Sequence, residues 1–160
     1  MDDPYDRTTV RCSANDLPEP LRAGIQVYAE EHQLDDPLAQ AEHCYTTHSV
    51  RQREPGLLAR LTGRVDPDSE HVTAVLITET LLLIGVHGRH RGVNVRSARL
   101  DSVTISKLPA ALITDPGVSV TALWFGVPEA SSFHVGADDG GGGRALVETL
   151  RRAVGTARGR

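Results

Sequence analysis

The densest apolar run in the chain covers residues 72–86 and reads VTAVLITETLLLIGV. Three polar residues interrupt it in the middle: Thr78, Glu79 and Thr80. A buried helix disfavours these residues, because threonine is β-branched and the glutamate would carry its charge into the core. Two short strands rich in Val, Leu, Ile and Thr that turn at these residues fit the pattern better. The run therefore predicts a central β-hairpin.

An earlier segment has helical spacing. Four apolar residues recur every three or four positions: Leu17, Leu21, Ile25 and Tyr28. They predict a helix with one apolar face over about residues 17–33. Asp16 is expected to cap its N-terminus, with Glu19 three residues later as in a capping box. Residues 1–15 are polar and lack a period, which predicts a flexible tail.

Strand patterns dominate the remainder of the chain. Alternating or β-branched segments predict strands at residues 43–50, 93–98, 100–107, 118–125 and 131–135. Leu57, Leu58 and Leu61 suit one short helix after the turn at Pro55-Gly56. Residues 136–143, GADDGGGG, are interpreted as a flexible link with a helix cap.

The last segment predicts an amphipathic helix over residues 144–156. Four apolar residues share one of its faces: Leu146, Val147, Leu150 and Val154. The chain thus consists of a helix, about seven strands and a closing helix. Because the strands follow one another without alternating helices, the expected fold class is α+β, mostly antiparallel β, a barrel or sandwich with helices at one end.

The order of these segments resembles the bacterial pleckstrin-homology-like (PH-like) domains. The resemblance rests on TAVLITETLLLIGV, a polar loop, VNVRSARLDSVTIS, a late pair of strands and ALVETLRRAV. In that family a Thr-x-x-Leu-Leu-Leu strand precedes a strand pair and a C-terminal helix that plugs one end of a bent antiparallel barrel. The resemblance covers about residues 43–156. With the polar tail at 1–15, it implies a helical addition at 16–42 and a PH-like domain at 43–156.

The resemblance implies a binding or assembly module without a cofactor rather than an enzyme. In family members that bind phosphoinositides, basic residues near the first two strands hold the lipid. The residues in the corresponding place are Arg51 and Arg53. The family's fuller Lys/Arg signature is missing, so membrane lipid is not the expected partner.

Charge and cysteine content narrow the expected partners and compartment. The net charge of −4 gives no global field favouring nucleic acid or an anionic membrane, where only a local basic patch could serve, so no nucleic-acid partner is expected. The N-terminus lacks the cationic start and apolar core of a signal peptide, which predicts a soluble, cytoplasmic protein. Cys12 and Cys44 are not in a CxxC motif. Free thiols are expected in a reducing cytosol, with a single bridge as the alternative.

A glycine-bounded basic loop, HGRHRG at residues 87–92, is one candidate binding site. Its candidate residues are His87, Arg89, His90 and Arg91. Two arginines and two histidines close together could hold a phosphate or an acidic partner. The alternative is a solvated hairpin connection, because peripheral anion sites usually need about 4–8 basic residues.

Histidine and cysteine could also ligate a metal. His43, Cys44 and His48 lie near one another, and His87 and His90 form a second pair. Zinc sites use three or four ligands with recurring spacing, and no second half of such a motif is found. Neighbouring residues on a strand also point to opposite faces. No metal is therefore expected.

Three further patterns carry weaker chemistry. GADDGGGG could cradle a phosphate, but no lysine follows and Asp138 and Asp139 would repel the anion. Trp124 and Phe125 are neighbours on one expected strand, so one could be core and the other exposed at an interface, or both could be buried. The sequence contains no Gly-x-Ser-x-Gly, and neither cysteine has a recognisable active-site context.

The expected function is a non-catalytic binding or oligomerisation module, whose partner is a protein or a second copy of the chain. The alternative is a small enzyme or ligand-binding barrel that uses the histidines, since residues distant in sequence can still meet in space.

Overall fold

The central hairpin predicted from the apolar run is confirmed in the computed structural model, which describes residues 4–52, 56–61, 68–106 and 116–160. Its strands are β3 (Glu70–Ile77) and β4 (Leu81–Gly88). The hydroxyl of Thr78 accepts hydrogen bonds from the N–H groups of Thr80 and Leu81, over 3.3 and 3.0 Å. The polar residues that interrupt the run thus build the turn.

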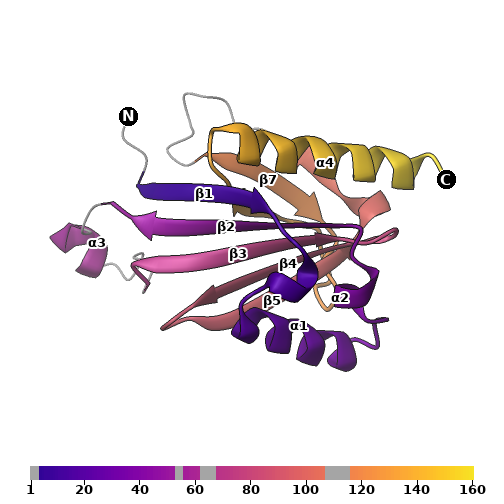
Figure 1. Cartoon of the computed structure of the whole chain (residues 1–160), viewed down its shortest axis with the longest axis horizontal. Helices are drawn as coiled ribbons and strands as arrows, with labels where there is room; N and C mark the ends of the chain where they lie inside the picture. Colours follow the sequence, from indigo (N-terminus) through magenta and orange to yellow (C-terminus); the bar gives the residue numbers. More distant parts are fainter. Residues whose placement is uncertain (1–3, 53–55, 62–67, 107–115) are drawn as a thin grey trace.

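Two antiparallel sheets and several helices form the described structure (Figure 1). The first sheet has the order β1 (Tyr5–Arg11), β2 (His43–Arg51), β3, β4, β5 (Gly92–Arg99). The second has the order β6 (Thr104–Ser106), β7 (Gly117–Ala122), β8 (Ser131–Gly136). The helices are α1 (Glu19–Glu31), α2 (Pro37–Gln40), α3 (Leu57–Leu61) and α4 (Gly141–Arg158). This confirms the expected α+β class with antiparallel sheets and a C-terminal helix.

The first sheet is covered on both faces. Val75 and Ile77 point into a core shared with the second sheet and α4, whereas Ala74 and Leu76 point into a second core under α1. Strands buried on both faces carry near-continuous apolar sequence, which explains the run at residues 72–86. Gly85 lets α1 approach, since a Cβ at this position would lie 3.2 Å from Leu21 Cδ2.

Helix α4 packs its predicted apolar face on the larger core. Leu146 and Leu150 are almost fully buried, whereas Arg151 is exposed. The hydroxyl of Tyr45 on β2 lies 2.8 Å from Thr149 Oγ1, which adds a polar contact between helix and sheet.

The glycine-rich segment before α4 is ordered, which corrects the expectation of a flexible link. Oδ1 of Asp138 accepts hydrogen bonds from the N–H groups of Gly140 and Gly143, over 3.0 and 2.8 Å. The helix begins at Gly141, three residues earlier than predicted. The carboxylate satisfies N–H groups that a helix start leaves without partners, and so it fixes the segment.

The flexible tail expected over residues 1–15 is also corrected, because residues 5–11 form strand β1. This strand buries polar side chains. Thr9 is 4% exposed, and its hydroxyl lies 2.9 Å from that of Thr47. Arg7 Nε donates to Ser49 Oγ over 2.9 Å. A strand that packs through hydroxyl and guanidinium groups shows no apolar period.

Three expected boundaries shift. Asp16 ends a short 3-10 turn (Ala14–Asp16), and α1 begins only after Pro18, so Asp16 is not its cap. The strand expected at 100–107 contains a 3-10 turn (Leu100–Ser102) before β6. Strand β7 ends at Ala122, because the chain turns there.

The early end of β7 leaves Trp124 and Phe125 outside the strand, so they do not face opposite sides of a sheet. Trp124 is 3% exposed and its indole N–H donates to the Ser131 carbonyl over 3.0 Å. Phe125 is half-buried, and its backbone N–H donates to the Ser97 carbonyl over 2.9 Å. Both residues therefore help to close the junction between the sheets.

Candidate functional site

The predicted basic loop connects β4 to β5 and folds around a buried carboxylate. Asp68 is 1% exposed, and its Oδ1 accepts the N–H of His90 over 2.7 Å. Its Oδ2 accepts the N–H and the Nε–H of Arg91, over 3.1 and 3.3 Å. A Cβ on Gly88 would lie 2.2 Å from Oδ2, so only glycine leaves room for this carboxylate.

The charge of Asp68 is stabilised where it lies. Burial raises the pKa of its carboxyl group, but the hydrogen bonds from His90 and Arg91 outweigh burial and hold the pKa below its ordinary value. An ionised Asp68 therefore partly neutralises the guanidinium of Arg91, and it occupies backbone N–H groups that an external phosphate would need.

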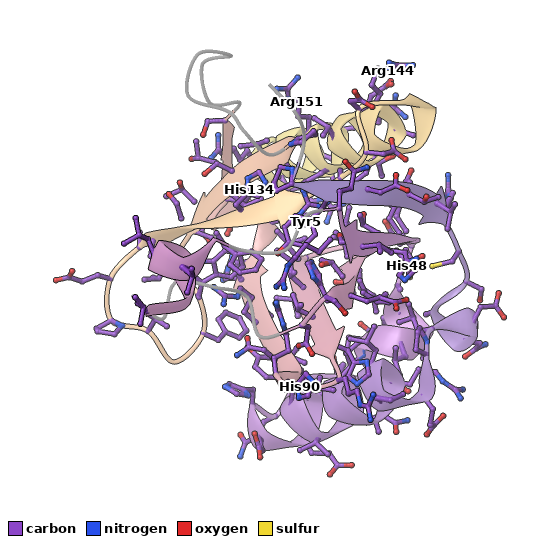
Figure 2. The ribbon with its side chains drawn as sticks, turned by 90° about the vertical axis from the view of Figure 1, so that its left-hand side faces the viewer. Tyr5, His48, His90, His134, Arg144 and Arg151 are labelled. Carbon is purple, nitrogen blue, oxygen red and sulfur yellow. The ribbon has the colours of Figure 1, made fainter. Side chains whose placement is uncertain are left out.

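Arg51, predicted as a separate basic residue, reaches the same centre. Its backbone N–H donates to the Ser69 carbonyl over 2.8 Å, and its guanidinium donates to the Asp68 carbonyl over 2.9 Å. Arg53 lies outside the described residues. Figure 2 looks onto this end of the molecule and labels His90, whose side chain is exposed.

The remaining predicted residues line a hollow of about 560 Å³ at the same end: His87, Arg89 and His90, together with Asp68. Glu70 also lines this hollow, and its carboxylate pairs with His48. The structure thus brings together every described residue of the predicted binding set. The arrangement suits weak pairing of exposed side chains with a carboxylate more than the cradling of a phosphate.

Helix α3 carries the most exposed apolar residues at this end of the molecule. The sequence predicts their helix but not that their side chains form an exposed apolar surface. Leu57, Leu58 and Leu61 of α3 are each 79% exposed. Helix α3 lies in the connection between β2 and β3. It therefore extends from the end of the first sheet at which Arg51 and the basic loop lie (Figure 1). Three leucines in a helix too short to pack a full apolar face are the sequence feature that could have indicated this exposed surface.

The predicted histidine and cysteine cluster separates. Nδ1 of His43 lies 3.1 Å from the guanidinium of Arg11, His48 pairs with Glu70, and Cys44 contacts Cys12. Across the part of the chain that the structure describes, no three His, Cys, Asp or Glu side chains are placed to hold a metal ion. No described helix is long and apolar enough to cross a membrane.

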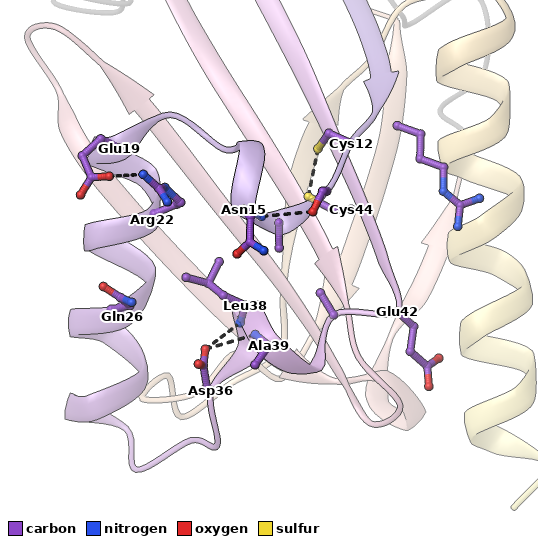
Figure 3. A pocket seen from close by; sticks show the side chains of 14 residues that line it. Cys12, Asn15, Glu19, Arg22, Gln26, Asp36, Leu38, Ala39, Glu42 and Cys44 are labelled. Carbon is purple, nitrogen blue, oxygen red and sulfur yellow. Dashed lines mark hydrogen bonds and ion pairs between the residues drawn. The ribbon is translucent and has the colours of Figure 1, made fainter.

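A polar pocket of about 700 Å³ lies at the opposite end of β2, beside α1 and α2 (Figure 3). Arg22 pairs with Glu19 in its wall, and Asp36 caps α2 by accepting the N–H groups of Leu38 and Ala39. Cys12 and Cys44 also line it. No sequence pattern predicts this pocket, because the pocket depends on the pairing of β1 with β2.

Comparisons with protein-family models, with curated proteins and with solved structures found no match for this chain.

Proposed function

We propose that this protein is a non-catalytic binding module that associates with a second copy of itself. The exposure of the three α3 leucines carries this proposal. We also propose that the domain is a PH-like barrel with an N-terminal addition. The consecutive antiparallel strands and the closing helix packed on the larger core support that assignment.

The leucines of α3 form an apolar surface that water solvates poorly. Each is 79% exposed, and full burial of one leucine side chain is worth about 1.5–3 kcal/mol. Large exposed apolar patches with polar borders mark interaction sites. The basic loop lies at the same end of the first sheet, where the side chains of Arg89 and His90 are exposed.

The same chain offers a surface of complementary chemistry. A groove of about 430 Å³ between α1 and β5 is lined mainly by apolar residues: Pro20, Ala23, Val27, Tyr28, Val93 and Val95. Val27 is 53% exposed. Exposed Glu30 and Glu31 stand on the same helix. The leucines of one copy would enter this groove of another copy, and the basic loop would face its glutamates.

A lipid surface fits the site less well. The net charge of −4 does not attract the chain to an anionic membrane. Asp68 already accepts the loop N–H groups that would bind a lipid phosphate. A partner that offers apolar side chains and carboxylates needs neither a favourable global charge nor free N–H groups.

Sedimentation velocity from micromolar to near-millimolar concentration tests the proposal. We expect the wild type to associate with rising concentration and Leu57→Asp/Leu61→Asp to remain monomeric. Leu123→Asp/Val127→Asp is the matched control, because it places the same charges at exposed apolar positions outside α3. This control should associate as the wild type does. Arg89→Glu should weaken association and reduce its dependence on salt.

A wild type that stays monomeric at every concentration contradicts the proposed self-association. The same proteins are then sedimented with anionic vesicles at about pH 6 and about pH 7.5, which bracket histidine titration. Vesicle binding that is lost in Leu57→Asp/Leu61→Asp would assign α3 to a lipid surface instead.

A further inference from the structure

The two cysteines of the chain meet although they are 32 residues apart in the sequence. Their sulfur atoms lie 3.1 Å apart. Cys12 directly follows β1, and its N–H donates to the Cys44 carbonyl over 3.0 Å. Backbone pairing of β1 with β2 therefore continues to this pair. Both side chains belong to the core under α1, so they lie on the same face of the sheet.

The two thiols differ in access to solvent. Cys44 is 3% exposed, whereas Cys12 is half-buried. Figure 3 shows the two sulfur atoms facing each other beside the polar pocket that both residues line. A small polar molecule in this pocket would meet half-buried Cys12 more readily than buried Cys44.

The contact between the two sulfur atoms also makes the pKa values of the two thiols differ. The hydrogen bond from Cys44 lowers the pKa of Cys12, whereas the same contact and burial raise the pKa of Cys44. The thiolate is the reactive form of cysteine in exchange with disulfides. Cys12 is thus suited to attack an external disulfide first, and Cys44 to attack the mixed disulfide that this forms on Cys12.

We propose that Cys12 and Cys44 are a redox-active dithiol that a low-molecular-weight disulfide oxidises to an intramolecular disulfide. The Cys12 thiolate attacks one sulfur of the external disulfide, which breaks and releases one small thiolate. Cys44 then loses its proton and attacks Cys12 Sγ, which releases the second small thiolate. Two electrons pass to the external disulfide, and the two protons of the cysteines end on the two released thiols.

The geometry requires little movement for this reaction. The sulfur atoms, 3.1 Å apart, must approach by roughly 1 Å to reach the length of a disulfide bond. The bond would close a loop that contains α1 and α2, and so it would fix both helices to the first sheet. Closing a loop of this size restricts the unfolded chain, so the oxidised protein should resist unfolding better than the reduced protein.

Incubation of the reduced full-length protein with oxidised glutathione tests the proposal by intact mass. We expect the wild type to lose two hydrogen atoms, to stay a single chain in non-reducing denaturing electrophoresis, and to lose both alkylatable thiols. Its thermal midpoint should rise by roughly 5–10 °C. Cys44→Ser should instead accumulate one glutathione on Cys12, because no second thiol resolves the adduct. Cys12→Ser should acquire no glutathione, because Cys44 is buried.

Three results would each overturn the proposal. The first is a wild type that keeps its mass and both thiols. The second is a stable glutathione adduct on the wild type. The third is covalent dimers linked between chains. None of these depends on the non-covalent self-association proposed for α3, because the electrophoresis is run on denatured protein.

Discussion

Thr9 and Asp138 exchange two hydrogen bonds across 129 residues of sequence. The N–H of Thr9 donates to Asp138 Oδ2 over 2.7 Å, and the N–H of Asp138 donates to Thr9 Oγ1 over 3.0 Å. Burial opposes ionisation of this carboxyl group, but hydrogen bonds from Thr9, Gly143 and Gly140 hold its pKa below the ordinary value. One carboxylate thus joins the edge strand β1 to the start of α4.

Asp138→Ala should therefore loosen both elements. The substitution removes a helix cap and leaves the N–H of Thr9 without its carboxylate, which together should lower the free energy of unfolding by about 2 kcal/mol. Urea denaturation measures the change. Asp139→Ala is the matched control, since Asp139 is the exposed neighbour. Equal midpoints for the two variants would mean that Asp138 does not join β1 to α4.

Strand β1 shows where sequence patterns stop being informative. The central hairpin was predictable, because apolar runs flank a short polar turn. The inward side chains of β1 include Arg7 and Thr9, whose partners are the hydroxyls of Ser49 and Thr47. Such partners lie far away in the sequence and leave no apolar alternation, so the strand was expected to be a tail.

The candidate sites, like the fold, were predictable only in part. The basic loop and Arg51 were predictable as residues, because their charge and flanking glycines stand out. Their assembly around Asp68 was not, since Asp68 belongs to a different turn and its carboxylate reaches the loop only in the folded chain. The contact between Cys12 and Cys44 depends on the register of β1 with β2, and that register requires a strand that the pattern did not predict.

The docking of α4 can be tested by a pair of neighbouring substitutions. Leu150 is 1% exposed in the larger core, whereas Arg151 is exposed. Leu150→Asp should cost several kcal/mol, roughly 3–5, because it buries a carboxylate without a partner. Arg151→Asp should change stability little. Thermal unfolding followed by circular dichroism compares them. Similar midpoints for both variants would contradict the docked arrangement of α4.

Replacing Gly88 by alanine, which adds only a methyl group, should destabilise the fold. A Cβ at this position would lie 2.2 Å from Asp68 Oδ2 and 3.0 Å from Arg91 Cγ, so the carboxylate would have to move away from the loop. Gly88→Ala should lower the free energy of unfolding by roughly 1–3 kcal/mol, as overpacking does elsewhere. Gly56→Ala is the control, because a Cβ there meets nothing within 4 Å. Chemical denaturation of both variants at neutral pH tests this. A loss of stability in Gly88→Ala alone indicates the close contact with Asp68, whereas an equal loss in both variants would indicate that alanine is unfavourable at either position.

Asp68 should make stability depend on pH in the acidic range. Its folded-state pKa lies below the ordinary value of 3.8, so the unfolded chain binds a proton at pH values where the folded chain does not. The stabilisation is therefore present above that ordinary value and is lost as the pH falls through the lower folded-state pKa.

Asp68→Asn should consequently be less stable than the wild type at neutral pH, with a difference that narrows on acidification. The amide keeps one acceptor oxygen but places an N–H₂ group against the donors of His90 and Arg91, so the loop loses its charged partner. Urea midpoints measured at several pH values from about 7 down to about 3 give the two curves. Glu129→Gln, which neutralises an exposed carboxylate elsewhere, controls for the change in net charge. The two curves should converge at low pH, because protonation of Asp68 removes from the wild type the same interaction that the substitution removes. Parallel curves for the wild type and Asp68→Asn would mean that the loop does not depend on an ionised Asp68.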